Sequence, residues 1–340
     1  MSEIRYDKLH DVHVIIASER LRRPDCLSAE ESESNPDDCP FCEGHEGMTP
    51  PEIFAVRPAS TPANTPGWQT RVVPNLYKAV QIESSYAHHL GIFEYWDGFG
   101  AHEVIIDTPY HSRSMSEWSV EDTFAWLRTL RQRVGDLRRD QRIAHLSLFK
   151  NEGMQAGATQ PHSHTQLIGL PIVPRSEEER HRRTLHHYLT TQQALMETVL
   201  THEIGSAERI VAQEGEFTAY CPYGSGYPFE IIISSVRSLG QIDTLRDSDL
   251  QSLASLLLLT LQKLKWQLGC LHFNLWIETP PLRPIVWENA SIEVDAAYRF
   301  SMRIMPRVYR CGGFELSTGV MINPVEPELA AKLLREGKNV

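Results

Sequence analysis

The sequence has no long apolar run and no excess of positive charge. Its 340 residues include 33 Lys and Arg against 44 Asp and Glu, a formal net charge of -11. No apolar run is longer than Leu256–Leu259, whereas a membrane-spanning helix needs about 20 residues. Binding to nucleic acid or to anionic lipid requires clustered Lys and Arg. We therefore expect a globular protein that binds neither nucleic acid nor a membrane, although a local basic pocket could still take an anionic small molecule.

A secretory signal and a cysteine framework are also missing. The segment Met1–Tyr6 lacks a charged region followed by an apolar stretch, so we expect the protein in the cytoplasm. Of six cysteines, the close pair is Cys39 and Cys42. In a reducing compartment such a pair indicates metal binding or redox chemistry rather than a structural disulfide.

The chain contains an internal repeat. The segment His102–Asp107 aligns with Phe229–Ser234, and the downstream segment His145–Phe149 aligns with His272–Trp276 without a gap. Similarity that stays in step over this length indicates a duplicated structural unit.

Each unit has the pattern strand, helix, strand. In the first, β-branched Val104–Ile106 precedes Ser119–Asp122, which offers an N-cap and acidic residues ahead of apolar residues at helical spacing. The segment Leu146–Phe149 is the expected returning strand, and Leu271–Ile277 is its counterpart in the second unit. We predict an α+β fold, with helices packed on two sheets or on one sheet built from two halves.

Two connecting segments complete this outline. The segment Glu177–His202 combines spaced leucines with many charges and is predicted to form a surface helix, whereas Ala59–Gly67, rich in Pro and Thr, is predicted to be a loop.

The most specific local pattern is the run His162, Ser163, His164, Thr165 and Gln166. If a strand begins at Ser163, alternation places the two histidines and the glutamine on one face. A neutral imidazole can attack phosphorus when donors such as an amide stabilise the developing charge. The alternative for an isolated pattern of this kind is a structural histidine pair hydrogen-bonded in a turn.

A segment with two glycines precedes the run from His162 to Gln166. Gly153, Gly157 and Thr159 supply two residues without a side chain and one hydroxyl. Such a loop lets backbone N–H groups approach a phosphate closely.

The pair Cys39 and Cys42 has the two-residue gap that lets both thiolates reach one tetrahedral zinc ion. A redox pair usually opens a helix after a strand, but Glu43–Gly47 continues as a loop. Zinc is therefore favoured, and it requires two further ligands.

Several motifs in order and spacing resemble the galactose-1-phosphate uridylyltransferase family. They are Cys39–Gly44, Arg71–Tyr77, Gly100–Ile105, Pro109–Ser112 and Asn151–Gln166. The resemblance extends over essentially the whole chain. It implies a duplicated histidine-triad fold and a ping-pong reaction through a nucleotidyl-histidine intermediate.

The resemblance also implies roles for individual residues. His164 is the expected nucleophile and Gln166 is expected to stabilise the transferred phosphoryl group. The implied zinc ligands are Cys39, Cys42, His111 and His162, and the implied nucleotide or phosphate contacts are Asn75, Asn151, Gly157 and Thr159. Four protein ligands leave no open position on the metal, so one structural zinc ion per chain is expected.

The two halves of the chain are expected to have different roles. We predict an N-terminal histidine-triad-like half, residues 1–175, with the metal and catalytic sites, and a C-terminal half, residues 176–340, without the catalytic histidines. The segment Tyr298–Arg303, which corresponds to the His-x-His strand, has no paired histidines. One catalytic centre per chain is expected, and the family resemblance implies a homodimer.

The C-terminal region leaves the substrate open. The patterns Gly312–Glu315 and Thr318–Pro324 resemble the branch related to ADP-glucose phosphorylase, and they replace sugar-binding residues of hexose-specific members. Transfer of a uridylyl group from UDP-glucose to a hexose 1-phosphate is placed first because it defines the family. The alternative is adenylyl transfer from ADP-glucose, adenosine phosphosulfate or a dinucleoside polyphosphate to phosphate. A non-catalytic nucleotide-binding protein is a third reading, which the presence of both His164 and Gln166 opposes.

Overall fold

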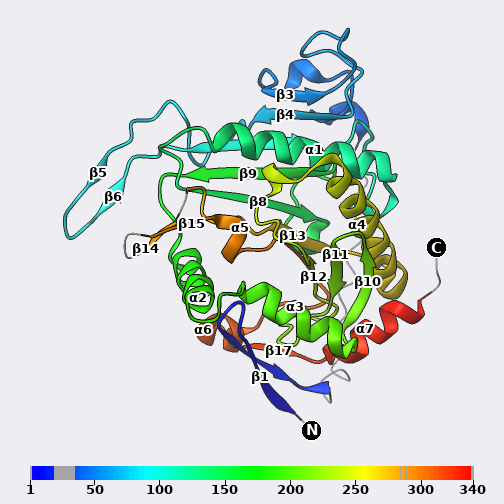
Figure 1. Cartoon of the computed structure of the whole chain (residues 1–340). Helices are drawn as coiled ribbons and strands as arrows, with labels where there is room; N and C mark the ends of the chain where they lie inside the picture. Colours follow the sequence, from blue (N-terminus) through cyan, green and yellow to red (C-terminus); the bar gives the residue numbers. More distant parts are fainter. Residues whose placement is uncertain (1, 19–34, 284, 288–289, 338–340) are drawn as a thin grey trace.

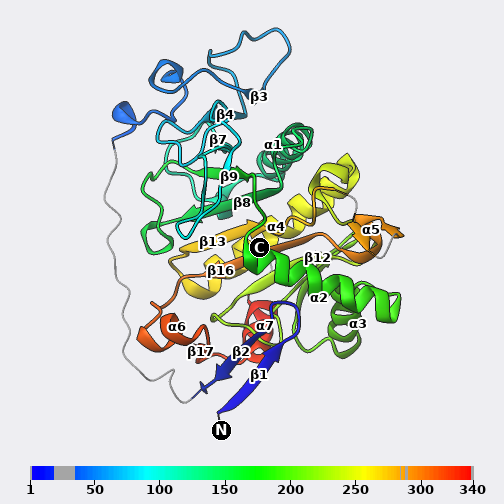
Figure 2. The ribbon, with the colours of Figure 1, turned by 90° about the vertical axis from the view of Figure 1, so that its left-hand side faces the viewer.

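The structure is a computed structural model that describes residues 2–18, 35–283, 285–287 and 290–337. Its main feature is one strongly curved sheet with the strand order β10-β11-β12-β16-β13-β8-β9-β7-β4-β3, all neighbours antiparallel (Figures 1 and 2). These strands are β3 (Phe54–Val56), β4 (Thr70–Pro74), β7 (Ala101–Ile106), β8 (His145–Glu152), β9 (His164–Leu170), β10 (Ile210–Glu214), β11 (Phe217–Tyr220), β12 (Ile231–Ser235), β13 (Phe273–Ile277) and β16 (Ser301–Pro306).

The duplication predicted from the repeat is visible in this order. The first half contributes the strands from β8 to β3 and the second half those from β13 to β10, and the halves meet where β8 pairs with β13. At this seam Asn151 lies opposite Asn274. The predicted α+β class is therefore confirmed in the form of one sheet built from two halves, while the domain boundary between residues 175 and 176 stays a prediction.

Two long helices cover one face of the sheet. They are α1 (Val120–Leu137) and α4 (Asp247–Leu268), which contact each other and follow equivalent strands of the two halves (Figure 1). The helix α1 starts at the predicted cap, where Ser119 accepts from the Asp122 N–H and Asp122 accepts in return. Their apolar faces, including Trp126 and Leu257, are buried in the main core.

Shorter elements cover the opposite face of the second half. They are α2 (Arg175–Thr191), α3 (Leu195–Ser206), α5 (Val294–Ala297), and a separate sheet of β1 (Glu3–Asp7), β2 (Val12–Ile16) and β17 (Met321–Asn323) (Figure 2). The remaining elements are the hairpins β5 (His88–His89) with β6 (Tyr95–Trp96) and β14 (Ile285–Trp287) with β15 (Ala290–Ile292), the helices α6 (Gly313–Thr318) and α7 (Pro327–Glu336), and the 3-10 turns η2 (Pro36–Asp38), η3 (Glu46–Met48), η4 (Met115–Glu117), η5 (Met154–Ala156) and η6 (Ile242–Thr244).

The predicted single helix over Glu177–His202 is wrong. The chain forms α2 and α3 with a break at Gln192, which has a left-handed φ of 59°. Leu185 of α2 packs beside α5, whereas Leu200 of α3 belongs to a different apolar cluster on β11 and β12. One straight helix cannot reach both clusters, so the chain turns between them. The predicted loop at Ala59–Gly67 is observed.

No helix of the described ranges is both long enough and apolar enough to cross a membrane.

Candidate active site and metal centre

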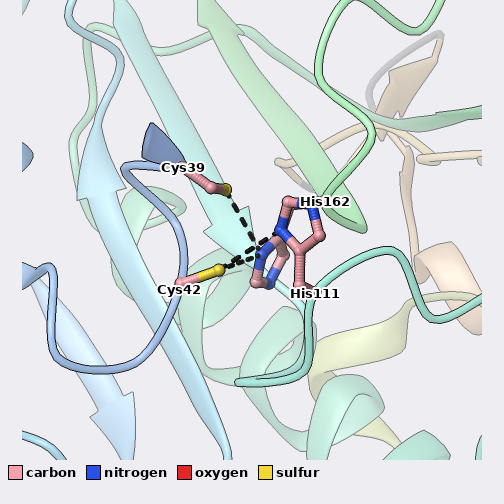
Figure 3. Close-up of side chains that lie close together, drawn as sticks. All are labelled: Cys39, Cys42, His111 and His162. Carbon is pink, nitrogen blue, oxygen red and sulfur yellow. Dashed lines mark hydrogen bonds between the residues drawn. The ribbon is translucent and has the colours of Figure 1, made fainter. Parts of the chain in front are cut away.

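Four predicted metal ligands meet on the sheet face opposite α1. Cys39 and Cys42 lie in a turn after η2, His111 follows β7, and His162 lies two residues before the start of β9. Their ligand atoms all lie within 4.8 Å of one another. The Cys42 sulfur is 3.2 Å from His111 Nδ1, and the two sulfurs of Cys39 and Cys42 are 3.6 and 3.7 Å from His162 Nδ1. In Figure 3 the two thiols and two imidazoles point toward one centre.

Hydrogen bonds around the cluster orient these side chains. The Nε2–H of His162 donates to the Thr108 carbonyl at 2.7 Å, which leaves the Nδ1 lone pair directed at the sulfurs. The Cys42 N–H donates to the Cys39 carbonyl, so the tight turn keeps both thiols on one side. His45 donates from Nδ1 to the same carbonyl at 2.7 Å.

The electrostatics of the cluster favour a cation. Burial and the neighbouring Cys39 raise the pKa of the Cys42 thiol to about 12, and burial lowers the pKa of His162 to about 4. The imidazole is therefore neutral and ready to ligate, while the thiols need a divalent cation to replace their protons. The residues fit a metal ion.

His164 is the first residue of β9 and is buried, with 8% of its surface exposed. Its Nδ1–H donates to the His162 carbonyl at 2.9 Å, so the lone pair of the ring is on Nε2. Burial lowers the pKa of His164, and the nearby ammonium of Lys150 contributes to the same shift. A neutral imidazole with one fixed tautomer is the form that acts as a nucleophile.

A buried ion pair supports this strand from the helix side. Lys150 of β8 donates to Asp107 at 2.9 Å and to Ser163 Oγ at 2.7 Å, and it also reaches the His164 carbonyl at 3.4 Å. Lys150 and Asp107 are each 1% exposed. Breaking such a pair leaves an uncompensated charge, so both residues hold the start of β9 in place.

Gln166 lies two residues beyond His164 on the same face of β9, as alternation predicts. Its Oε1 is 3.2 Å from His102 Nε2, and Asn75 Nδ2 is 3.0 Å from the same nitrogen. Asn75 also lines an open cleft of about 630 Å³ beside Tyr77 and Lys78. Asn75, a predicted nucleotide contact, and Gln166 thus both contact the ring of His102.

The other predicted contacts lie between β8 and β9. Asn151 Oδ1 accepts from Asn274 Nδ2 at 2.8 Å across the seam, and Asn274 also donates to the Ala156 carbonyl at 2.9 Å. Gly157 and Thr159 are exposed in the same loop, and Gly157 has a left-handed φ of 85°. This loop leads into His162 and His164.

The equivalent surface of the second half carries different chemistry. Phe149 pairs with Gln166 and its repeat partner Trp276 pairs with Arg303, so Arg303 takes the position of Gln166. Two residues earlier, Ser301 takes the position of His164. Arg303 forms an ion pair with the fully buried Glu230 and lies 5.3 Å from the Trp276 ring centre. The guanidinium of Arg303 is thus held by an ion pair at the position that Gln166 takes in the first half.

The geometry of the first half suits transfer of a phosphorus group. On and around β9 lie a neutral histidine, His164, and the amide of Gln166. The glycine-containing loop and the cluster of two cysteines and two histidines lie beside them. Comparison with known proteins agrees. A family model described as "Galactose-1-phosphate uridyl transferase, N-terminal domain" matches residues 1–174.

The chain belongs to the galactose-1-phosphate uridylyltransferase family.

Relatives of known activity match over nearly the full length. ADP-glucose phosphorylase from Arabidopsis thaliana is 32% identical over 340 residues, which cover 98% of this chain and 92% of that protein. Galactose-1-phosphate uridylyltransferase from Thermotoga maritima is 23% identical and covers 99% of this chain and 98% of that protein. The chain is thus similar to both branches considered in the sequence analysis.

Solved structures of the family have the same fold. The crystal structure of an ADP-glucose phosphorylase from Arabidopsis thaliana with bound ADP-glucose has a TM-score of 0.82, 29% sequence identity and complete coverage of both chains. A uridylyltransferase structure, with a TM-score of 0.74 and 19% identity, covers 98% of this chain and 97% of that chain and shares the fold. This member of the galactose-1-phosphate uridylyltransferase family is a nucleotidyl-transferring enzyme with a duplicated α+β fold.

Three residues around the site were not predicted from the sequence. His102 and Asn274 lie in the repeated segments, and Lys150 belongs to no motif in the sequence. Alternation along β7 could have placed His102 on the face of Gln166, but the contact of Asn274 with Asn151 depends on how the two halves pair.

Proposed function

We propose that this chain is an adenylyl-transferring phosphorylase that carries AMP on His164. The single observation that carries the proposal is the fixed tautomer of the buried His164, whose Nδ1–H is bound to the His162 carbonyl at 2.9 Å while Nε2 keeps its lone pair. This is the atom that forms the bond to phosphorus.

The reaction has two steps. His164 Nε2 attacks the α-phosphorus of ADP-glucose, a P–N bond forms, and the P–O bond to glucose 1-phosphate breaks with departure of that anion. An oxygen of inorganic phosphate then attacks the same phosphorus, the P–N bond breaks, and ADP leaves with His164 restored. Gln166 donates N–H groups to the phosphoryl oxygens, whose charge develops in both steps.

Other residues are proposed to bind the nucleotide. Asn75 lies at the open cleft, and Asn151, Gly157 and Thr159 belong to the strand end and loop that lead into His164. A hydroxyl and backbone N–H groups in a glycine-containing loop suit the phosphates. The amide of Asn75 suits a hydroxyl or phosphate oxygen of the nucleotide.

Adenine is favoured over uracil by the comparisons. The Arabidopsis ADP-glucose phosphorylase is 32% identical to this chain, against 23% for the Thermotoga uridylyltransferase. The C-terminal pattern Gly312–Glu315 supports the same choice. Uridylyl transfer from UDP-glucose to a hexose 1-phosphate such as galactose 1-phosphate, through the same histidine, is the second candidate because that activity defines the family.

Intact mass spectrometry separates the two candidates. The protein is incubated with ADP-glucose or UDP-glucose without an acceptor. An AMP adduct on His164 is expected, lost on adding phosphate with release of ADP, and His164→Gly should form none. The exposed His202, changed to Gly, is the matched control. A UMP adduct alone would favour the second candidate, and no adduct with either donor would overturn both.

The metal is proposed to be a single structural zinc ion. Two thiolates and two imidazoles form a closed, soft donor set that zinc prefers. When bound, it would supply rigidity at His162, two residues before the nucleophile. We expect about one zinc per chain by elemental analysis, consistent with four ligands from one chain.

Loss of the zinc ion should affect both stability and the nucleophile. Dialysis against a strong chelator should lower Tm by several degrees and slow adduct formation together, because His162 loses its anchor. Cys42→Ser should do the same, whereas the distant Cys221→Ser is the control for loss of a buried cysteine. Full activity in a zinc-free protein would contradict this role.

A homodimer is proposed from the family resemblance and one surface feature. The hairpin of β5 and β6 projects from the body (Figure 1), and its tip exposes Leu90, Ile92 and Phe93 by 81, 94 and 89%. Exposed apolar side chains that lie together are typical of contact surfaces. Light scattering should give twice the chain mass of 38.8 kDa, and Phe93→Asp should reduce it toward the monomer.

A further inference from the structure

His102 connects three segments that are distant in sequence. It lies on β7, and its ring receives the Ala79 N–H on Nδ1 at 3.0 Å, while its Nε2 faces Gln166 Oε1 at 3.2 Å. On the neighbouring strand, Gln166 pairs with Val104, so His102 reaches it diagonally on the same face of the sheet. The repeat partner of His102 is Phe229, which has no such nitrogen.

The backbone decides the tautomer of this ring. A backbone N–H can only donate, so Nδ1 must accept and carries no proton. The single ring proton is therefore assigned to Nε2, which donates it to Gln166 Oε1.

This assignment fixes the orientation of the Gln166 amide. An amide has one acceptor end and one donor end, and a donor at Oε1 holds the oxygen toward β7. The two N–H groups are then left for a phosphoryl oxygen on His164, which lies two residues away on the same face. Without the ring, the amide could rotate and present its oxygen to that negative charge.

Asn75 competes with Gln166 for the same ring nitrogen. Its Oδ1 accepts from the Tyr77 N–H at 2.8 Å, so the atom 3.0 Å from His102 Nε2 is the Asn75 Nδ2, which donates. When Nε2 carries the proton, this contact brings two donors together and is unfavourable, whereas the contact with Gln166 Oε1 pairs a donor with an acceptor. The N–H groups of Asn75 are then left for the nucleotide in the adjoining cleft.

We infer that His102 is a positioning residue that selects the productive orientation of the Gln166 amide. The inference rests on the proposed function, because it requires that Gln166 donate to the transferred phosphoryl group. His102 does not itself touch the reacting atoms; it acts through Gln166.

The test is single-turnover formation of the nucleotidyl adduct in holoenzyme with ADP-glucose. His102→Leu should slow adduct formation by about 10- to 100-fold, less than the roughly 10²- to 10³-fold loss for removing a direct donor. The dissociation constant for ADP-glucose should change by less than about threefold, because a group that acts in the transition state affects the rate rather than the affinity. Tm and zinc content should stay near the wild-type values.

Two further variants separate positioning from a structural role. His102→Gln retains an N–H donor for Gln166 and should recover most of the lost rate. In a double-mutant cycle, the loss for His102→Leu with Gln166→Leu should be smaller than the two single losses combined, because the ring acts on the rate through Gln166. Additive losses, or equal losses in His102→Leu and His102→Gln, would overturn the inference.

The same series distinguishes the inference from the proposed function. If the wild-type protein forms no adduct, the proposed function and the inference both fail. If it forms an adduct on His164 and His102→Leu reacts at the wild-type rate, the inference alone fails. If His102→Leu does not fold, the rate of adduct formation by His102→Gln is compared with that of Gln166→Leu. A His102→Gln rate as low as the Gln166→Leu rate would overturn the inference that His102 positions Gln166.

Discussion

Gly153 occupies a position where a single methyl group would disturb the site loop. It has φ 80° and ψ 156°, a conformation that residues with a side chain rarely adopt. An added Cβ would lie 1.6 Å from Nδ1 of His272, which comes from the second half of the chain. The glycine is thus required both by its backbone angles and by the close approach of the two halves.

Gly153→Ala should therefore destabilise the protein strongly. We expect a loss of about 1–3 kcal/mol from backbone strain and about 1–3 kcal/mol more from overpacking, measured by urea unfolding. Gly157→Ala is the matched control, because Gly157 also has a positive φ of 85° but open space around its Cβ position. It should lose only about 1–2 kcal/mol. If both variants lose the same free energy of unfolding, the contact with His272 does not contribute to the cost of a side chain at position 153.

Among the elements, the hairpin of β1 and β2 is attached to the second half by charge. Between its strands, the two ring nitrogens of His10 lie 2.7 Å from Asp7 Oδ2 and 3.1 Å from Glu278 Oε1, and both carboxylate oxygens are acceptors for a ring N–H. Arg180 lies 2.9 Å from Glu278 on the same cluster, and Arg303 is close enough to act on His10. Burial and Arg303 oppose protonation of His10, but the two carboxylates outweigh them and raise its pKa.

The stability contributed by this hairpin should depend on pH. Because the pKa of His10 is higher in the folded than in the unfolded protein, its contribution is fully present below the unfolded value and is lost as the pH rises through the folded value. The difference in Tm between wild type and His10→Gln should therefore be largest below about pH 6.5, the usual pKa of histidine, and shrink as the pH rises above it. The exposed His13, changed to Gln, is the matched control. A difference that is constant over this range would contradict the ion pairing.

At the scale of the whole molecule, the seam between β8 and β13 makes the site depend on both halves. Asn274 holds Asn151 and the Ala156 carbonyl, and His272 packs on Gly153. The second half therefore supports the strand end and loop that lead to His164.

Asn274→Ala should weaken nucleotide binding without removing the metal. Two hydrogen bonds are lost, each worth about 0.5–1.5 kcal/mol, so the dissociation constant for ADP should rise by about 5- to 150-fold, measured by calorimetry. Gln213→Ala, an exposed change on β10 of the same half, is the control. An unchanged dissociation constant for ADP in Asn274→Ala would contradict the idea that the contacts between β8 and β13 support nucleotide binding.

Much of this arrangement was predictable from local patterns. The cap at Ser119 and the alternation that places His164 and Gln166 on one face depend on residues close in sequence, and the repeat is visible as a similarity between two distant segments; the structure agrees with each. The predicted helix over Glu177–His202 was wrong because its apolar residues serve two separate clusters, which spacing alone does not distinguish.

The sequence by itself determined the residue types that metal binding and phosphoryl transfer require, the helix and strand periods, and the family. The tertiary structure decided which atoms meet. The proton of His102 is assigned by the N–H of Ala79, and Asn151 is held by a residue from the other half. A tautomer or a cross-seam hydrogen bond depends on partners that only folding brings within about 3 Å, and no local pattern along the chain encodes that distance.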